Sequence, residues 1–218
     1  MKETTKNNLS FFGFPIMVIL FCHIIVKLLN PVTTPYTWIP GMISYWLISF
    51  SIVYFDCRKR KIHFTKYLKG TKFKFYLIVI AIVAGFIPFP IFILHFKLLT
   101  APFLIGSWIF VALVNPFFEE IFWRGYLLDH AAKLPVFLKI IYSSALFTLS
   151  HTFIWGVFAK AMLTPELIIS VFVMGILWSF IYLKSKSIVL PYFSHLLVDI
   201  FNLSVLAMMN LLPIVMHF

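Results

Sequence analysis

The sequence predicts an all-α protein, a polytopic membrane helical bundle with about seven transmembrane helices. Of its 218 residues, 62% are hydrophobic and only 11% are charged, whereas a soluble domain carries about 25% charged residues. Apolar runs long enough to cross a bilayer, about 20 residues each, recur along the chain. Basic residues gather between these runs, as they do in the loops of membrane proteins.

One integral membrane domain is expected to cover residues 1–218, because the chain has no internal repeat, low-complexity tract or soluble linker. The net charge of +11 does not indicate nucleic-acid binding, because the basic residues lie between apolar runs as topology signals do. The partner that this composition implies is the lipid bilayer. Cys22 and Cys57 fall in a predicted span and in a basic loop, so no disulfide is expected between them.

The first three predicted spans cover residues 9–29, 38–55 and 75–95. A polar, uncharged turn at 30–35 separates the first two. The segment 56–74 after the second span is strongly charged and holds eight basic residues. In the third span, Pro88 and Pro90 are expected to kink the helix, because proline cannot donate the backbone hydrogen bond of a helix interior.

The remaining spans are predicted at residues 101–128, 136–158, 165–183 and 188–212. Pro116 is expected to distort the first of these or to begin a new helical piece. Thr164 is expected to cap the helix that Pro165 begins, since proline suits the first helical position. Residues 101–212 form the core in which we expect the functional motifs.

The distribution of lysine and arginine predicts the orientation of the chain. With the N-terminus in the cytoplasm and seven crossings, 15 of the 18 basic residues fall on the cytoplasmic side, Arg124 among them. Lys27, Lys97 and Lys160 fall on or near the outer side. We therefore expect a multi-pass cell-membrane protein with its N-terminus in the cytoplasm and its C-terminus outside.

Ionisable side chains interrupt the fourth span in the segment 115–128, NPFFEEIFWRGYLL. Charged groups at membrane depth are costly and functional by default, and two of the chain's seven acidic residues, Glu119 and Glu120, lie here. Residues four apart share a helix face, so Glu120 is expected to pair with Arg124, while Glu119 remains available for chemistry. The alternative is a charged cluster that only anchors the helix end.

Two later spans also carry ionisable residues. His151 follows Phe147 by four residues in the fifth span, and His195 precedes Asp199 by four in the seventh. Each has a structural alternative: a packed core histidine, and a His–Asp hydrogen bond that only stabilises its helix. The expected topology puts the glutamates, His195 and Asp199 at the cytoplasmic end, with His151 deeper, after about 20 Å of helix. A shared site is the hypothesis that accounts for all three sets.

Three short motifs follow one another in the last half of the chain: Glu119-Glu120-xxx-Arg124, Phe147-xxx-His151 and His195-xxx-Asp199. In this order they resemble the signature of the CPBP family, which includes type II CAAX prenyl proteases and bacterial Abi-type intramembrane proteases. The resemblance implies a helical intramembrane endopeptidase. Such an enzyme would cleave a peptide or membrane-protein substrate near the cytoplasmic membrane face.

The resemblance also implies a role for each motif residue. Glu119 and His151 would activate a water molecule, as a base near neutral pH can do. His195, with the residue four positions beyond it, would stabilise the developing oxyanion. Glu120 and Arg124 would shape the site.

Asp199 stands where the CPBP family often has asparagine, and an ionised carboxylate would repel an oxyanion. Asp199 would then be protonated, orient His195, or bind a metal. Glu119, His151 and His195 are also a reasonable ligand set for zinc, with water in the open position. A metal-free glutamate mechanism is the alternative, so the sequence leaves the cofactor open between zinc and none.

Two other functions fit parts of the sequence. A non-catalytic membrane scaffold, of the bacteriocin-immunity or signalling-modulator type, would bind a partner protein. A small transporter would relay protons or ions through the same residues, but it predicts inverted repeats, and the chain shows none. Activity that depends on Glu119 favours the enzyme, and partner binding that Glu119→Gln does not change favours the scaffold.

Overall fold

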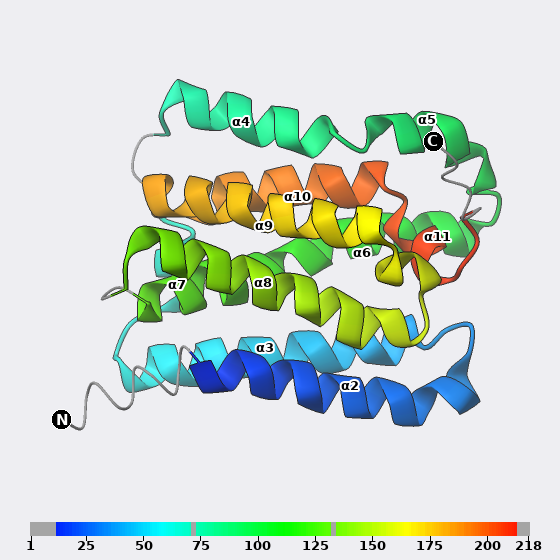
Figure 1. The fold of residues 1–218 in the computed structure, drawn as a ribbon, viewed down its shortest axis with the longest axis horizontal. Helices are drawn as coiled ribbons and strands as arrows, with labels where there is room; N and C mark the ends of the chain where they lie inside the picture. Colours follow the sequence, from blue (N-terminus) through cyan, green and yellow to red (C-terminus); the bar gives the residue numbers. More distant parts are fainter. Residues whose placement is uncertain (1–11, 71–72, 132–133, 213–218) are drawn as a thin grey trace.

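The computed structural model describes residues 12–70, 73–131 and 134–212, and every regular element in them is a helix (Figure 1). Six helical segments are long and apolar enough to cross a membrane. These candidate spans are Phe14–Thr33, Trp38–Lys59, Phe75–Leu98, Pro102–His130, Val136–Val157 and Pro165–Ser185. The predicted fold class, an all-α polytopic membrane bundle, is confirmed.

Most spans consist of one long helix, and two are divided. The α-helices of these spans are α2 (Phe14–Thr33), α3 (Trp38–Lys59), α4 (Phe75–Phe86), α5 (Phe89–His95), α6 (Pro102–Glu120), α7 (Leu127–His130), α8 (Val136–Ile154) and α9 (Pro165–Ser185). Short 3-10 turns are η2 (Phe64–Tyr67), η3 (Phe96–Leu98), η5 (Trp155–Val157) and η6 (Lys160–Leu163).

Proline and threonine set several of these boundaries. The third span divides between α4 and α5 at the Pro88 and Pro90 pair, as predicted. The hydroxyl of Thr164 accepts a hydrogen bond from the backbone N–H of Leu167 at 3.4 Å, with Pro165 at the first helical position. The predicted cap of this helix is therefore confirmed.

Pro116 does not begin a new helix. It lies inside α6, which continues unbroken to Glu120. The irregular part comes next, as a π-helical segment at Ile121–Tyr126 (η4), and α7 then completes the span. Single π-turns inside α-helices occur frequently at functional sites, and this one carries Arg124.

The prediction of an unbroken seventh span at 188–212 is wrong. Helix α10 covers Val189–Phe201, and its 13 residues rise only about 20 Å, less than the roughly 30 Å core of a bilayer. Leu203 has a left-handed backbone with φ of 53°, after which the short α11 covers Ser204–Met208. Residues 192–212 contain no glycine or proline, so the sequence does not signal such a turn.

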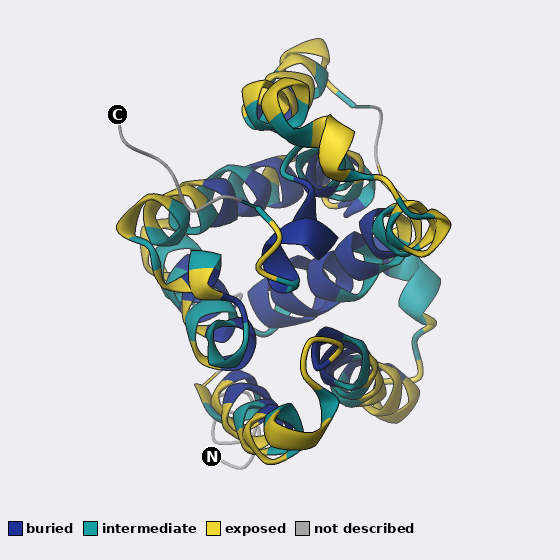
Figure 2. Ribbon diagram, turned by 90° about the vertical axis from the view of Figure 1, so that its right-hand side faces the viewer, coloured by how far each residue is buried: buried dark blue, intermediate teal, exposed yellow. Residues whose placement is uncertain are grey.

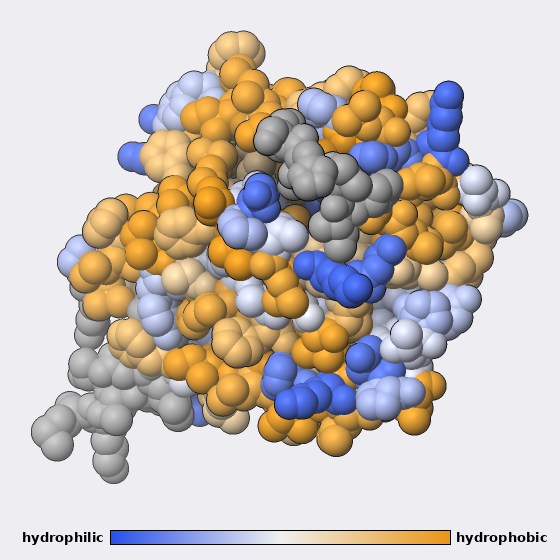
Figure 3. All heavy atoms as spheres, turned by 45° about the vertical axis from the view of Figure 1, so that its right-hand side comes forward, coloured by the Kyte–Doolittle hydropathy of each residue, from blue (hydrophilic) through white to orange (hydrophobic). Residues whose placement is uncertain are grey.

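Buried residues face the middle of the bundle and exposed residues face outward (Figure 2). All six residues of η4 are buried, and α6 contacts α3, α10 and α11, so this span occupies the interior. Apolar atoms cover most of the surface in Figure 3. This arrangement suits a protein whose outer surface is in contact with lipid tails.

The connections between helices alternate between two ends of the bundle (Figure 1). The segment that joins α3 to α4, the α7–α8 connection and the α9–α10 connection lie at the end where α2 begins, which we call the basic end. The α2–α3 turn, η3, η6 and α11 lie at the opposite end. This alternation is the one that the topology prediction requires, and the side that faces the cytoplasm remains a prediction.

Candidate active site

The motif residues of α6 and η4 lie inside the bundle. Glu119, Glu120 and Arg124 are each 0% exposed. The prediction that they sit at the cytoplasmic end of the span is wrong, because α7 extends the helix ten residues beyond Glu120 to His130, about 15 Å. Arg124 is therefore not a charge of the basic end. The partners described next explain how it can be buried.

Glu120 pairs with Arg124, as the spacing predicts, and also with a histidine from another span. Nη1 of Arg124 lies 3.3 Å from Oε1 of Glu120. The same oxygen accepts a hydrogen bond of 2.9 Å from Nδ1 of His195, in α10. One carboxylate oxygen thus connects η4 and α10. Since burying two charges is costly even when they are paired, such an arrangement is more typical of a functional site than of a stabilising element.

Aromatic rings enclose the guanidinium of Arg124. Its central carbon lies 4.3 Å from the ring centre of Phe147 and 5.2 Å from that of Trp178. Cation–π attraction is strongest where the cation is removed from water, so these rings compensate part of the cost of burial. Trp178 also stacks on His195, with ring centres 4.1 Å apart. The same rings therefore hold both partners of Glu120.

Glu119 points to a different set of groups. Its Oε2 accepts a hydrogen bond of 3.1 Å from the amide nitrogen of Asn115 and lies 3.5 Å from Nε2 of His195. Its Oε1 is buried and has no hydrogen-bond partner among the described residues. A buried acceptor without a partner is costly, so this oxygen is a natural place for a water molecule or a substrate group.

Asp199 faces the same imidazole from one turn further along α10. Its Oδ1 lies 3.7 Å from Nε2 of His195, and its Oδ2 accepts a longer hydrogen bond, 3.4 Å, from Asn115. The His195–Asp199 pair that the spacing predicts is present. The closer carboxylate partner of His195 is nevertheless Glu120, at 2.9 Å.

His151 reaches the cluster through Phe147. Its ring lies edge-on to the ring of Phe147, with 4.6 Å between the ring centres. The ring of His195 also lies edge-on to Phe147, with 6.1 Å between the ring centres. Nδ1 of His151 donates to the carbonyl of Phe147 at 3.0 Å. In a neutral ring this places the proton on Nδ1 and leaves Nε2 as the acceptor.

His151 and the glutamates lie at more similar depths in the bundle than the sequence indicated. It lies 15 residues into α8, about 22 Å of helix, whereas the glutamates themselves lie about 15 Å from the same end. The two motifs are therefore separated by less depth than their predicted positions implied.

Several residues of the site carried no predicted role. Asn115 lies four residues before Glu119, and this spacing is a signal that could have identified it. Trp46 donates to the side-chain oxygen of Asn115 at 3.0 Å. The contact of Trp178 with both Arg124 and His195 has no sequence signal, because its span reads as uniformly apolar.

The donor arrangement does not fit the zinc set considered from the sequence. Among the described residues, no group of three or more His, Cys, Asp or Glu side chains is placed to hold a metal ion. Nδ1 of His195 is bound to Glu120 and Nδ1 of His151 to its own helix, so only the Nε2 atoms of these rings are left as possible ligands. Glu119, His151 and His195 therefore do not converge as ligands in this structure.

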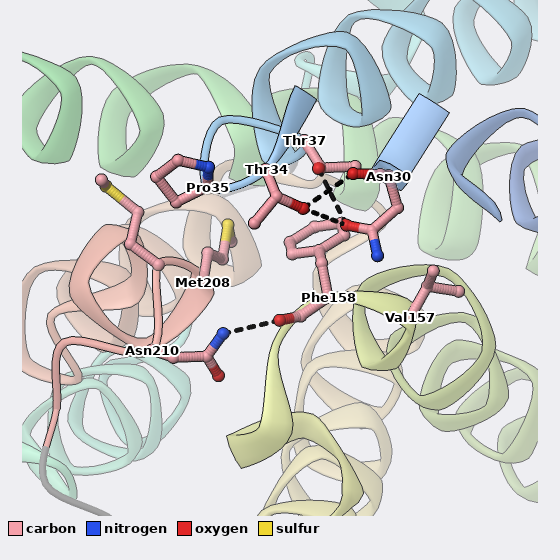
Figure 4. A pocket seen from close by; sticks show the side chains of 9 residues that line it. Asn30, Thr34, Pro35, Thr37, Val157, Phe158, Met208 and Asn210 are labelled. Atoms are coloured by element: carbon pink, nitrogen blue, oxygen red, sulfur yellow. Dashed lines mark hydrogen bonds between the residues drawn. The ribbon is translucent and has the colours of Figure 1, made fainter. Parts of the chain in front are cut away.

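A small pocket lies beside the α2–α3 turn (Figure 4), at the end of the bundle opposite the basic end (Figure 1). Asn30, Thr34 and Thr37 from the α2–α3 region face Phe158 and Asn210 across it. None of the predicted site residues lines this pocket. The buried cluster of Glu119, Glu120, Arg124 and His195 is thus separate from this pocket.

The fold and the site define a class: a multi-pass membrane protein with a buried cluster of carboxylates, imidazoles and one guanidinium. Residues 100–201 match the family model of Rce1-like proteins, described as type II CAAX prenyl endopeptidase Rce1-like. Residues 100–201 are thus similar to an Rce1-like domain, which agrees with the resemblance to the CPBP family and supports a CAAX-type protease at the family level. No curated protein and no solved structure matches the chain.

Proposed function

We propose that this protein is an intramembrane endopeptidase that hydrolyses a peptide bond in a peptide or membrane protein. The observation that carries the proposal is a buried carboxylate, Glu119, whose Oε1 has no partner among the described residues and which, unlike Glu120, is not paired with Arg124. This carboxylate is otherwise held by Asn115 and faces His195. The family match includes this residue.

In the proposed reaction, Glu119 and His151 activate water. Oε1 of Glu119 accepts a proton from the water, and Nε2 of His151 is the second acceptor that orients it. The water oxygen then forms a bond to the carbonyl carbon of the substrate. The proton taken by Glu119 passes to the amide nitrogen as the carbon–nitrogen bond breaks, so the products are a carboxylic acid and an amine.

His195 is the proposed donor to the oxyanion. Its Nδ1 is bound to Glu120, and its Nε2 lies between the oxygens of Glu119 and Asp199 at 3.5 and 3.7 Å. Because Nδ1 already donates to Glu120, Nε2 can donate only in the doubly protonated imidazolium, the form that the surrounding carboxylates favour. This nitrogen is then positioned to donate to a negative oxygen that develops beside it. Asp199 then acts with Glu120 to orient His195 and is not itself the donor.

The membrane orientation belongs to the same proposal. Without Arg124, 14 of the chain's 18 basic residues are still predicted for the cytoplasmic side. The glutamates lie closer to this end of the span Pro102–His130 than to the other. We propose that cleavage takes place on the cytoplasmic side of the bilayer centre.

A proteolysis assay in detergent tests the proposal. A quenched library of lipidated and membrane peptides is incubated with the wild type, with Glu119→Gln and with His151→Ala. Glu166→Gln and His95→Ala are the matched controls, because Glu166 is exposed at the start of α9 and His95 ends α5. We expect both site variants to lose cleavage and both controls to retain it.

The other outcomes decide between the alternatives. Cleavage that survives both site substitutions comes from a contaminant. If no library member is cleaved and a captured partner binds Glu119→Gln as well as the wild type, the protein is a scaffold. A chelator is expected to leave cleavage unchanged, since the ligand set does not converge, and loss of activity that zinc restores would establish a metal mechanism.

A further inference from the structure

The amide of Asn115 connects two carboxylates that belong to different helices. Its nitrogen donates to Oε2 of Glu119 at 3.1 Å, within α6, and to Oδ2 of Asp199 at 3.4 Å, across to α10. A side-chain amide nitrogen carries two hydrogens, so one can serve each carboxylate. Asn115 itself is 5% exposed.

Trp46 of α3 determines which way this amide faces. Its indole N–H can only donate, so the Asn115 atom that lies 3.0 Å from it must be the oxygen. The nitrogen of the amide is then directed to the carboxylates. Trp46 is held in turn by stacking on Phe118, with ring centres 5.5 Å apart.

We infer that Asn115, oriented by Trp46, is a positioning residue that fixes the carboxylates of Glu119 and Asp199 on either side of His195. Two carboxylates beside one another repel, and a shared donor keeps them in place without adding a charge. The free oxygen of Glu119 is then held in one direction. The catalytic part of this inference rests on the proposed function.

Three variants separate the contributions of the amide and of the indole. Asn115→Asp keeps the shape and the acceptor for Trp46 but replaces the donor by an oxygen. Trp46→Phe removes the indole N–H and keeps an aromatic ring beside Phe118. Ser49→Ala is the matched control, since Ser49 is fully buried in α3 and bonds only to carbonyls of its own helix.

Kinetics with a cleaved peptide test the positioning role. We expect Asn115→Asp to lower kcat about 10- to 100-fold, the scale of lost hydrogen bonds to charged groups, with KM changed less than about 2-fold. Trp46→Phe is expected to lower kcat about 2- to 10-fold, and Ser49→Ala to leave it unchanged. A general loss of structure would instead lower the active fraction in all three.

A thermal-unfolding cycle tests the link without any substrate. We expect Trp46→Phe to lower Tm in the wild type but not in an Asn115→Leu background, because the two side chains stabilise the fold as one unit. Shifts that simply add would overturn the link. If Asn115→Leu does not fold, Asn115→Ala, which also removes the acceptor for Trp46, replaces it in the cycle with Trp46→Phe and is judged by the same criterion.

The two hypotheses fail in different ways. Wild-type kcat in Asn115→Asp, together with loss in Glu119→Gln, would overturn the positioning role and leave the protease. Cleavage that does not depend on Glu119 would overturn the proposed function and the catalytic part of this inference. The unfolding cycle would then still decide whether Asn115 and Trp46 act together.

Discussion

The two neighbouring glutamates differ in what surrounds them, and this difference is the basis of the roles that we propose for them. One oxygen of Glu120 is occupied by both Arg124 and His195. Each glutamate keeps one buried oxygen without a partner among the described residues, but the other oxygen of Glu119 is held by the neutral amide of Asn115 and forms no ion pair with Arg124. Adjacent residues on a helix are rotated by about 100°, which is why one sequence motif can supply both an orienting carboxylate and a reactive one.

Aspartate and asparagine at position 199 are expected to support similar rates of peptide cleavage. Asp199→Asn should keep cleavage within about 10-fold of the wild type, because the 2.9 Å bond from Glu120 still orients His195. Glu120→Gln should cost about 10- to 100-fold, since it removes a charged hydrogen-bond partner. Rates of the two variants on one peptide provide the comparison, and the reverse order would contradict these roles.

Replacing Arg124 is expected to lower the free energy of unfolding more than replacing a surface arginine does. Arg124→Met leaves Glu120 buried without its cation and should lower the free energy of unfolding by about 3–5 kcal/mol. Arg60→Met removes an exposed pair with Asp56 at 3.3 Å and should cost less than about 1 kcal/mol. Thermal unfolding in detergent measures both, and equal losses would show that the burial of Arg124 is not what the site depends on.

At the scale of elements, the contact between α8 and α9 sets the space that holds Arg124. A side-chain carbon on Gly175 would meet the backbone of Ser144 at 3.1 Å, so these helices approach closely there. Three residues further along each helix, Phe147 and Trp178 face each other with ring centres 6.0 Å apart. The close approach therefore determines the distance between the two rings that enclose the guanidinium.

Glycine-to-alanine substitutions test this packing. Gly175→Ala should destabilise the protein by about 1–3 kcal/mol, as overpacking in a close contact does, and should lower cleavage. Gly106→Ala is the control, because nothing lies within 4 Å of its added carbon and the change in a helix interior should stabilise by about 0.5–1 kcal/mol. A Gly175→Ala variant as stable as Gly106→Ala would show that α8 and α9 are free to separate.

Element positions were largely predictable, and the reasons for the exceptions are physical. Apolar runs of sufficient length predicted seven spans, of which six are present among the described residues as helices long enough to cross a membrane, and prolines predicted the break between α4 and α5. The end of α10 at Phe201 and the left-handed Leu203 were not predictable. A leucine in this conformation carries no local signal, since the preference for left-handed backbone belongs to glycine and asparagine.

In the site, contacts within one helix were predictable from the sequence and contacts between helices were not. Pairs four residues apart on one helix, such as Glu120 with Arg124, were read from spacing and are present. Contacts between helices could not be predicted from spacing, because they depend on how the spans pack. The bond from His195 to Glu120 and the bridge from Asn115 to Asp199 are of this kind.

At the scale of the whole molecule, the orientation in the membrane is open to a direct experiment. Lys69→Cys lies at the basic end and Lys97→Cys at the other, and both lysines are exposed. An impermeant maleimide should label Lys97→Cys in intact cells and Lys69→Cys only after permeabilisation, if the basic end faces the cytoplasm. Cys22 and Cys57 are buried, so background labelling should be low. The opposite pattern would invert the proposed topology.

The most direct test of the central claim is the rate of peptide hydrolysis by Glu119→Gln in proteoliposomes, measured beside the wild type and Glu166→Gln. The substitution keeps the size of the side chain and removes its ability to accept the proton of water. We predict a loss of about 10²- to 10⁴-fold, the usual contribution of a general base, with unchanged thermal unfolding and a wild-type rate for Glu166→Gln. A Glu119→Gln rate equal to the wild type would contradict the account.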